Sequence, residues 1–563
     1  MITLKFEEAR RITGPNLLSQ QPGALIDVSI DGISHEDVWQ CWQKNISEIL
    51  NLLGWQNENL YHRKYDGGIS LSISAPIDAL YTACQAAELA WLLCESQLQS
   101  TVFTDKELKL NELMISLAGE VNPTLLALIA LAIEKGVSYL VDDDFFSLGT
   151  GVTCQVWPVT ELPQASSIQW AGFKKIPAAF ITGTNGKSTS VRLASTIAKN
   201  AGLQAGVTST DFIRVGETIL DTGDYSGPGG ARILLRHCET EIAFLEVARG
   251  GLLRRGLPVC DNQAALITNI AADHLGQYGI NTVPELAEVK FIVDKGLIDT
   301  GVLILNADDD ELVRLSANTI HSICWFSMDK DNSLIQANMN KGLAVVFFHD
   351  QHIHFVKAEY TFSVAVNDIV MTFNGTATYN IRNAMGVIGL CCALKIEHKA
   401  ILKGLKEFGS DPFDNPGRGN RYQYNGAEVI VDFAHNQHSM SAVIEMAKNI
   451  PAKRRLVMFS HAGDRSDQDM FELNEEVLKF EADEYVIAEL EIYLRGRELG
   501  EIPALVKTHL LNNHVAENHI TLCDSPLAGA EHTLTKIQAG DVVLLFALDQ
   551  RDKIHQLLQL AQS

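Results

Sequence analysis

The feature that most constrains the fold of this chain is an apolar run that ends in a glycine-rich turn. The run Ile176 to Thr182 leads directly into GTNGKST at 183–189, and a helical pattern runs from Ser188 to Asn200. The two glycines let the backbone turn with its N–H groups inward, and the positive end of the helix dipole points to the same place. Lys187 can reach the outer phosphates of a nucleotide, and the Ser188 hydroxyl can bind Mg²⁺. The sequence therefore predicts a strand, a phosphate-binding loop and a helix, although Ile181 breaks the longer GxxxxGK[ST] pattern.

Alternating apolar runs and helical patterns continue on both sides of a turn-rich stretch at 409–420. Before it, apolar runs occupy 242–247, 264–270 and 302–305; after it they occupy 429–433, 455–460, 485–490 and 541–547. This alternation is typical of mostly parallel sheets with helices on both faces. We predict an α/β protein with a central domain at 166–408 and a smaller α/β domain at 409–563, preceded by an α+β region at 1–165.

The composition fits a globular protein and disfavours two classes of partner. Hydrophobic residues make up 46% of the 563 residues, and 69 acidic against 45 basic residues give a net charge of −24. Nucleic acid and anionic membranes reward concentrated positive charge, so neither is an expected partner. No apolar run reaches the roughly 18 residues of a membrane span, and the first residues have no signal-peptide core. We expect a cytoplasmic protein with reduced cysteines, and a homo-oligomer is compatible with the sequence.

Several stretches carry a resemblance to one family. With the phosphate loop, they are TSTD (208–211), GDYSGPGGAR (223–232), LEVARGGLLRRGL (245–257), ITNIAADHLGQYGI (267–280), NPGR (415–418), VDFAHNQHS (431–439), GDRSDQD (463–469) and RGRELGEIP (495–503). Together they resemble the Mur ligase superfamily, most of all the Mur-like half of cyanophycin synthetase. The resemblance implies a central P-loop ATPase domain and a Rossmann-like C-terminal domain. Residues 12–32 resemble the N-terminal domain of cyanophycin synthetase.

The resemblance implies an ATP-dependent amide ligase. Such an enzyme converts a carboxylate into an acyl phosphate, which an amine then attacks, and ADP and phosphate are released. The carboxylate and the γ-phosphate repel each other, so two Mg²⁺ ions are expected to screen them. The implied metal-binding residues are Ser188, Glu246, His274 and Lys290, the last as a carbamylated lysine. With Lys187, the last three of these are also the implied catalytic residues.

The resemblance also implies residues for ATP and for the other substrates. The ATP-binding set is Gly183, Thr184, Asn185, Gly186, Lys187, Ser188, Thr189, Asn383, Arg418 and Asp432. The set expected around the carboxylate and the amino acid is Thr208, Ser209, Asp211, Arg249, His435, Asn436, Asp464 and Arg497. The chain departs from the family pattern at Tyr379, where a histidine usually precedes the first asparagine of the adenine-binding motif.

A missing module limits the chemistry of this chain. Residues 132–151 resemble the beginning of an ATP-grasp domain, but the Mur-like phosphate loop follows about 25 residues later, and a module of about 200 residues is absent. By itself the chain is therefore expected to form one kind of amide bond. The amine could be that of arginine, and the carboxylate that of an aspartyl peptide or another small acid. A peptidoglycan- or folate-type amino acid ligase, and an ATP-binding pseudoenzyme that scaffolds a partner ligase, stay open as alternatives.

Overall fold

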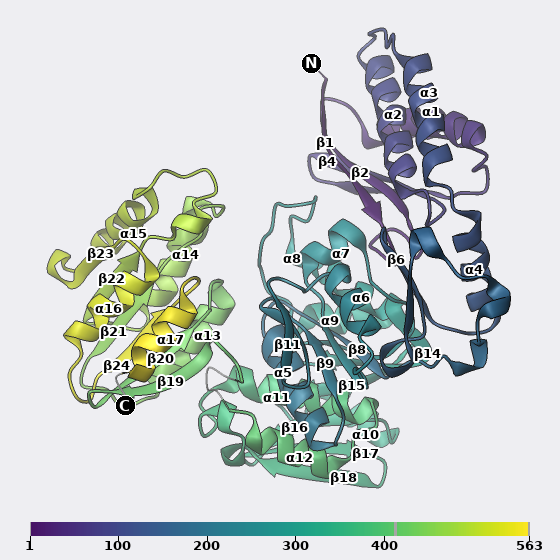
Figure 1. Cartoon of the computed structure of the whole chain (residues 1–563). Coiled ribbons are helices and arrows are strands. Elements are labelled where there is room, and N and C mark those ends of the chain that lie inside the picture. Colours follow the sequence, from purple (N-terminus) through teal and green to yellow (C-terminus); the bar gives the residue numbers. More distant parts are fainter. Residues whose placement is uncertain (1, 410–413, 561–563) are drawn as a thin grey trace.

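The computed structural model describes residues 2–409 and 414–560 of the chain. It contains a central α/β body, an α/β lobe formed by the C-terminal residues, and an N-terminal region that packs on the central body (Figure 1). The predicted boundary stretch at 409–420 lies partly outside the described residues, at 410–413. The α/β class predicted from the alternating runs is confirmed.

The central body is built on one sheet of eleven strands around the phosphate loop. Its strands, in spatial order, are β11 (Thr218–Thr222), β10 (Phe212–Val215), β9 (Ala205–Thr208), β12 (Ile242–Glu246), β8 (Ala178–Thr182), β13 (Asn262–Ile267), β14 (Leu297–Asn306), β15 (Ser322–Ser327), β16 (Val345–His349), β17 (His352–Lys357) and β18 (Tyr360–Ala365). The strands from β9 and β12 to β16 pair in parallel, and β10, β11, β17 and β18 add antiparallel edges. The sequence predicted the parallel centre but not these edges.

Helices cover both faces of this sheet because side chains alternate along each strand. On β8, Ala179 and Ile181 face one buried cluster, and Ala178 and Phe180 face the other. The first face is covered by α5 (Lys187–Asn200), α11 (Thr378–Ala393) and α12 (His398–Glu407). The second is covered by α6 (Pro228–Arg236), α7 (Arg249–Arg255), α8 (Val283–Phe291), α9 (Asp310–Leu315) and α10 (Ser333–Asn340).

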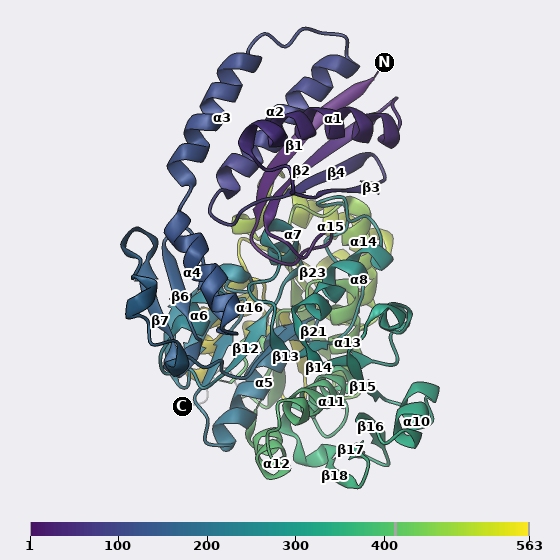
Figure 2. The same cartoon turned by 90° about the vertical axis from the view of Figure 1, so that its right-hand side faces the viewer.

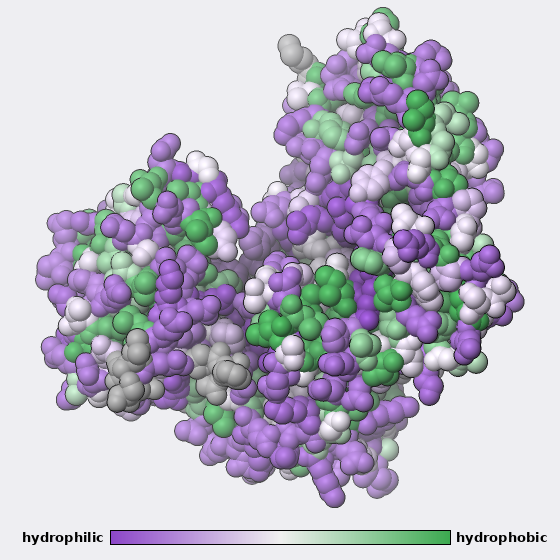
Figure 3. All heavy atoms as spheres, in the orientation of Figure 1, coloured by the Kyte–Doolittle hydropathy of each residue, from purple (hydrophilic) through white to green (hydrophobic). Residues whose placement is uncertain are grey.

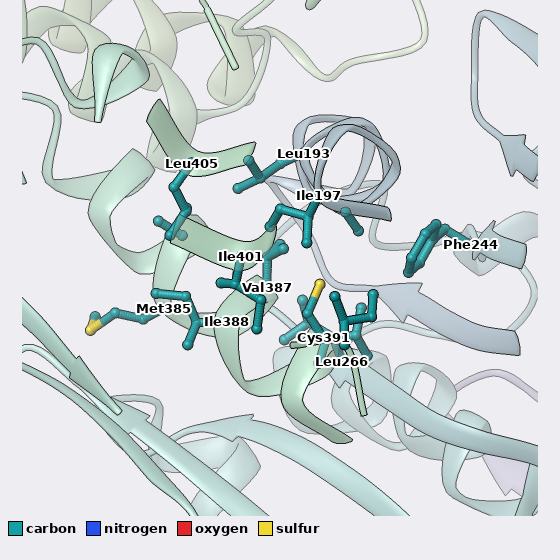
Figure 4. Packing of buried hydrophobic residues seen from close by; sticks show 14 of the residues in the cluster. Leu193, Ile197, Phe244, Leu266, Met385, Val387, Ile388, Cys391, Ile401 and Leu405 are labelled. Atoms are coloured by element: carbon teal, nitrogen blue, oxygen red, sulfur yellow. The ribbon is translucent and has the colours of Figure 1, made fainter. Parts of the chain in front are cut away.

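The helix that follows the phosphate loop is fixed by this core. Leu193 and Ile197 of α5 pack against α11 and α12, whose Cys391 and Ile401 are fully buried (Figure 4). Burying each such aliphatic side chain contributes about 1.5–3 kcal/mol. The N-terminus of α5 is therefore held rigidly at the carboxyl end of β8.

The C-terminal lobe is a second doubly wound unit. Its sheet has the order β19 (Arg418–Tyr424), β20 (Ala427–Asp432), β24 (Val542–Phe546), β21 (Arg455–Phe459), β22 (Glu484–Ala488) and β23 (Ile520–Cys523), and only β19 is antiparallel. One face carries α13 (Gln437–Lys448), α14 (Asp467–Leu478) and α15 (Glu501–Asn512). The other carries α16 (Pro526–Lys536) and α17 (Arg551–Leu560).

The N-terminal region contains two small antiparallel sheets. The first has the order β1 (Thr3–Ile12), β2 (Gly23–Asp31), β4 (Gly68–Ser74) and β3 (Leu60–Tyr65), and it packs against α1 (His35–Leu53) and α2 (Leu80–Leu98), with α3 (Lys106–Glu120) beside α2. The second is β5 (Tyr139–Val141), β6 (Phe145–Leu148) and β7 (Gln155–Pro158), with α4 (Pro123–Glu134). Figure 2 shows the first sheet above α7 and α8 of the central body.

The segment at 158–175, predicted as a linker, is irregular but packed. It forms three short 3₁₀ turns, and Leu162, Ile168, Trp170 and Phe173 pack against the cluster around α4 and β6.

In the part of the chain that the structure describes, no single helix is long and apolar enough to cross a membrane; α3 and α4 reach that length only together, across a 58° bend.

Candidate active site

A cavity of about 660 Å³ lies where the carboxyl ends of the central strands face the C-terminal lobe. Figure 3 shows the surface deeply indented between that lobe and the rest of the molecule. Ligands collect at such strand ends in open α/β sheets. Predicted residues that line this cavity are Thr184, Asn185, Gly186, Lys187, Ser188, Thr189, Asp211, Glu246, Arg249, His274, Lys290, Arg418, His435 and Asp464. The fold therefore brings together residues up to 280 positions apart in the chain.

The phosphate loop needs its two glycines. Gly183 and Gly186 have φ angles of 141° and 85°, which side chains rarely tolerate. A Cβ atom at Gly183 would lie 1.9 Å from Thr268 Oγ1, and one at Gly186 would lie 2.2 Å from Asn383 Oδ1. The loop thus fits tightly between the end of β13 and helix α11.

We expect Gly183→Ala to abolish nucleotide binding and to destabilise the fold by more than about 1 kcal/mol, the usual cost of a strained alanine. Thr268 cannot move away easily, because its hydroxyl also donates to the carbonyl of Asn185 at 2.6 Å. Gly202→Ala is the matched control, since φ is +78° there but nothing lies within 4 Å of an added Cβ. Thermal unfolding and titration with a fluorescent ATP analogue measure both effects. Equal behaviour of the two variants would contradict the tight fit.

Two polar groups mark the start of helix α5. The N-cap residue of α5, Gly186, has no side chain that could satisfy the first N–H groups, which border the cavity. Lys187 Nζ donates to the Thr184 carbonyl at 2.9 Å, and Ser188 Oγ lies 3.2 Å from Thr210 Oγ1. Uncapped N–H groups beside a lysine form an anion site.

Glu246, at the end of β12, is a buried carboxylate that points to a ligand. Its residue is 2% exposed, and neither carboxylate oxygen has a hydrogen-bond partner among the described residues. Burial raises the pKa of Glu246, against the Lys187 and Arg418 charges and the nearby Ser188 hydroxyl, which lower it. An unpaired buried carboxylate is costly unless a cation binds it.

His274 lies beside two further groups that can bind metal. Asp273, His274 and His435 each offer a ligand atom, and these atoms lie within 4.8 Å of one another. Burial raises the pKa of Asp273, but the nearby His435, His274 and Lys290 lower it below its usual value. The sequence analysis missed Asp273, although its position directly before His274 was the available signal, and it placed His435 with the substrates.

Lys290 is buried instead of exposed on its helix. Its Nζ donates to the Gly183 carbonyl at 2.9 Å, and the residue is 3% exposed. Burial, with the charges of Lys187 and Arg249, lowers the pKa of Lys290 to about 7, against the opposing effect of Asp273. A lysine with a lowered pKa loses its proton more readily than an exposed lysine, and its uncharged amine is nucleophilic.

A second cavity, of about 530 Å³, adjoins the first and shares six lining residues with it: Asn185, Gly186, Thr189, Arg418, Phe433 and His435. It is lined by the predicted Asn383 and Asp432, and by Tyr379, whose buried hydroxyl has no partner among the residues described. Burial raises the pKa of Asp432 to about 6, against Arg418 and backbone N–H groups. Its wall combines apolar side chains such as Ile270, Phe433 and Val443 with many polar groups, and such a pocket beside a phosphate loop can hold a nucleoside.

An arginine cluster borders the phosphate loop. Arg418 and Arg551 each lie 4.6 Å from the centroid of the Phe433 ring, and Asp211 forms ion pairs with Arg192 and, at 3.0 Å, with Arg551. Burial raises the pKa of Asp211, but Arg192, Arg418 and Arg551 lower it to about 2. No sequence motif indicated Arg551, because it comes from α17, at the far end of the chain.

Four predicted substrate residues are not in the lining of either cavity. Thr208 Oγ1 accepts from the Glu246 N–H at 3.1 Å, and Ser209 Oγ accepts from Asp211 and Phe212 N–H. Asn436 caps α13 and bonds to Asn185.

The fourth residue, Arg497, pairs with Asp467 at 2.6 Å and Glu501 at 2.7 Å, outside the cavity. Arg495, which the sequence analysis missed, lines the cavity in its place and pairs with Asp464. Arg495 and Arg497 are two residues apart on the same loop, and their spacing in the sequence does not say which of them faces the cavity.

The chain is similar in sequence to cyanophycin synthetase and similar in fold to several solved ligase structures. Cyanophycin synthetase of Trichormus variabilis is 32% identical over 333 residues, which are 59% of this chain and 37% of that protein, so the chain spans less than two fifths of it. E. coli FolC with DHPP and ADP has a TM-score of 0.52 at 17% identity, covering 69% of this chain and 89% of that one. A bifunctional folylpolyglutamate synthase/dihydrofolate synthase with Mn, AMPPNP and L-glutamate has a TM-score of 0.50 at 15% identity, covering 68% and 89%. These two likenesses show the fold.

Two family models match the chain itself. The Mur ligase middle domain matches residues 181–391, and the Mur ligase glutamate ligase domain matches residues 417–547. Both matches coincide with the two doubly wound units that enclose the cavities. Through these two domains, the chain belongs to the Mur ligase family.

Proposed function

We propose that this protein is an ATP-dependent ligase that joins a carboxylate to the amine of an amino acid. The observation that carries the proposal is the unpaired buried carboxylate of Glu246 in the same cavity as the phosphate loop. Similarity to cyanophycin synthetase and membership of the Mur ligase family support it. A buried charged group without a protein partner, in a cavity, is typical of a ligand-binding site.

The reaction proceeds in two balanced steps. A carboxylate oxygen attacks the γ-phosphorus of ATP, which gives an acyl phosphate and ADP. The amine nitrogen then attacks the acyl carbon, inorganic phosphate leaves, and the nitrogen gives up a proton. Lys187 and the start of α5 bind the outer phosphates, and Arg418 and Arg551 add positive charge beside them. Closure of the cleft between the two lobes would keep water from the acyl phosphate.

The residues present fit divalent ions. We assign Ser188 and the unpaired Glu246 to the ion that accompanies ATP, and Asp273, His274, His435 and Lys290 to the second ion. The hydroxyl and carboxylate oxygens of the first set suit Mg²⁺, whereas the second set adds two imidazole nitrogens to its carboxylate; a synthase structure of similar fold contains Mn. When bound, the ions supply charge neutralisation for the triphosphate and the carboxylate. The sequence-based assignment is thereby extended by Asp273 and His435.

Charged side chains in the cavity limit the chemical class of the substrates. Arg249, Arg254, Arg465 and Arg495 line the part of the cavity contributed by α7 and the C-terminal loops, and Asp224 and Asp464 lie among them. Guanidinium groups bind carboxylates, and Asp224 offers a place for an ammonium or guanidinium group, as does Asp464 once a substrate replaces its ion pair with Arg495. Arginine as the amino acid and an aspartyl peptide as the acceptor fit this mixture, as the likeness to cyanophycin synthetase suggests.

A coupled ADP-release screen of the full chain over pooled amino acids and small peptides tests the proposal. We expect turnover that requires ATP, a divalent ion, one amine and one carboxylate together. Turnover without arginine would favour a peptidoglycan- or folate-type ligase. ATP binding without turnover under every combination would instead favour a pseudoenzyme that scaffolds a partner ligase.

We further propose that Lys290 is carbamylated. Its uncharged amine adds to CO₂ and loses one proton, which gives a carbamate anion that can bind a metal. Removing CO₂ from buffer above the pKa of about 7 should slow turnover by about tenfold, the cost of losing a metal-ordering group, and bicarbonate should restore it.

Labelling with ¹³C-bicarbonate checks the modification directly, with Lys290→Met as the control. We expect a carbamate signal in the wild type and none in the variant. The same spectrum for both proteins would contradict carbamylation and leave the ligase proposal standing.

A further inference from the structure

The loop at 273–280, which carries Asp273 and His274, has an unusual backbone. His274 and Tyr278 have φ angles of 49° and 58°, and Gly276 and Gly279 have 86° and 64°. Non-glycine residues adopt such angles only where surrounding structure holds them. The loop's own hydrogen bonds join Gly276 N–H to the Ile280 carbonyl and Ile280 N–H to the Gln277 carbonyl. Two short local bonds leave the carbonyls of Tyr278 and Gly279 for partners elsewhere.

Arg63 of the N-terminal strand β3 supplies those bonds. Its NH2 group donates to the Gly279 carbonyl at 2.8 Å and to the Tyr278 carbonyl at 3.2 Å. Its NH1 group lies 3.4 Å from Glu285 Oε1. One planar guanidinium therefore joins the loop to the first turn of helix α8.

Helix α8 carries Lys290, so the second contact of Arg63 also leads to the cavity. The Glu285 carboxylate accepts from the Asn281 and Thr282 N–H groups and closes the capping box of α8. Lys290 follows on the same helix, with its Nζ on the phosphate-loop carbonyl of Gly183. A shift of Arg63 would thus move both the 273–280 loop and the start of α8.

Two aromatic contacts from the same sheet support the loop. The ring of Tyr65 fills the space beside Gly279, where an added Cβ would lie 2.6 Å from that ring. The Arg10 guanidinium lies 4.8 Å from the centroid of the Tyr278 ring and is held by an ion pair with Asp27. From helix α7 of the central body, Arg249 donates to the His274 carbonyl at 2.8 Å.

We propose that Arg63 is a positioning residue for the divalent-ion site: through the Tyr278 and Gly279 carbonyls and Glu285, the N-terminal sheet fixes the loop that carries Asp273 and His274 and the helix that carries Lys290. This inference rests on the proposed function. It gives the N-terminal region a task that needs no active site of its own.

The test compares Arg63→Ala and Arg63→Lys with Lys64→Ala in the full chain. Lys64 is the exposed neighbour on β3 and pairs with Glu36, away from the loop. Three readouts are measured: binding of Mn²⁺ by electron paramagnetic resonance of the free ion, hydrogen exchange of the 273–282 peptide, and binding of a fluorescent ATP analogue without metal.

For Arg63→Ala we expect Mn²⁺ affinity to fall by about tenfold to a hundredfold, as for loss of a group that orients metal ligands. Exchange of the 273–282 peptide should accelerate, while nucleotide binding without metal stays within twofold of wild type. Arg63→Lys should recover part of the Mn²⁺ affinity, and Lys64→Ala should equal wild type.

Wild-type Mn²⁺ affinity and wild-type exchange of the peptide in Arg63→Ala would overturn the inference. That outcome differs from failure of the proposed function, in which the wild type itself neither binds Mn²⁺ nor releases ADP. A variant that unfolds is recognised by accelerated exchange throughout the chain, and the Arg63→Lys variant then decides.

Discussion

Lys187→Ala is expected to lower the rate of ADP release by about a thousandfold or more, which corresponds to at least about 4 kcal/mol of transition-state stabilisation. The reason is local: Lys187 is the cation at the first position of α5, and its Nζ lies on the phosphate loop, 2.9 Å from the Thr184 carbonyl. Without Lys187, the negative charge on the transferred phosphoryl group loses the lysine of the phosphate loop that would stabilise it. Steady-state ADP release at saturating ATP and Mg²⁺ measures the loss.

Lys199→Ala is the matched control for this variant. Lys199 lies on the last turn of the same helix, and its exposed side chain pairs with Glu217. Such an exposed pair contributes less than about 1 kcal/mol, so activity and unfolding should stay near wild type. Wild-type turnover of Lys187→Ala would remove the phosphate-loop assignment.

The second large effect is expected for Glu246→Gln, which should stop turnover even at saturating Mg²⁺. The substitution keeps the volume of the side chain and removes its charge. Because the buried carboxylate lacks a partner among the residues described, the free energy of unfolding without ligands should stay the same or rise by about 1 kcal/mol. ADP release and urea unfolding, with circular dichroism as the signal, measure the two quantities.

Loss of activity together with undiminished stability is the result that separates a ligand-binding carboxylate from a structural one. Glu217→Gln, in the exposed turn between β10 and β11, controls for the loss of one negative charge and should change neither quantity. If Glu246→Gln turned over normally, Glu246 would be only structural, and the assignment of the ATP-linked ion would fall with it.

The sequence predicted the parts of the fold that depend on local pattern. Helix α5, expected at Ser188–Asn200, runs over Lys187–Asn200, and the strand expected to end at Thr182 is β8, which does end there. Because buried parallel strands are continuous apolar runs, their positions can be predicted from the sequence. The antiparallel edges β10, β11, β17 and β18 were not predicted, because short strands at the edge of a sheet carry a weaker pattern than continuous buried runs.

The sequence predicted the site residues that belong to a recognisable motif. It missed residues that reach the site only because the fold brings distant segments together. Lys187, Glu246, His274 and Lys290 all line one cavity, and their roles stay predictions. Arg551 and Arg63 come from the C-terminal and N-terminal regions of the chain, and no local sequence pattern connects them to the phosphate loop. Arg497 was placed at the site by its motif, but ion pairs hold it outside.

By itself the sequence determined which segments become strands, helices and a phosphate-binding turn, since these follow from side-chain period, glycine backbone freedom and local capping. Tertiary structure alone decided the environments: that the amine of Lys290 is buried and that the carboxylate of Glu246 lacks a partner among the residues described. The physical reason is that pKa and unmet hydrogen bonds depend on what packs around a group, and those neighbours come from distant parts of the chain.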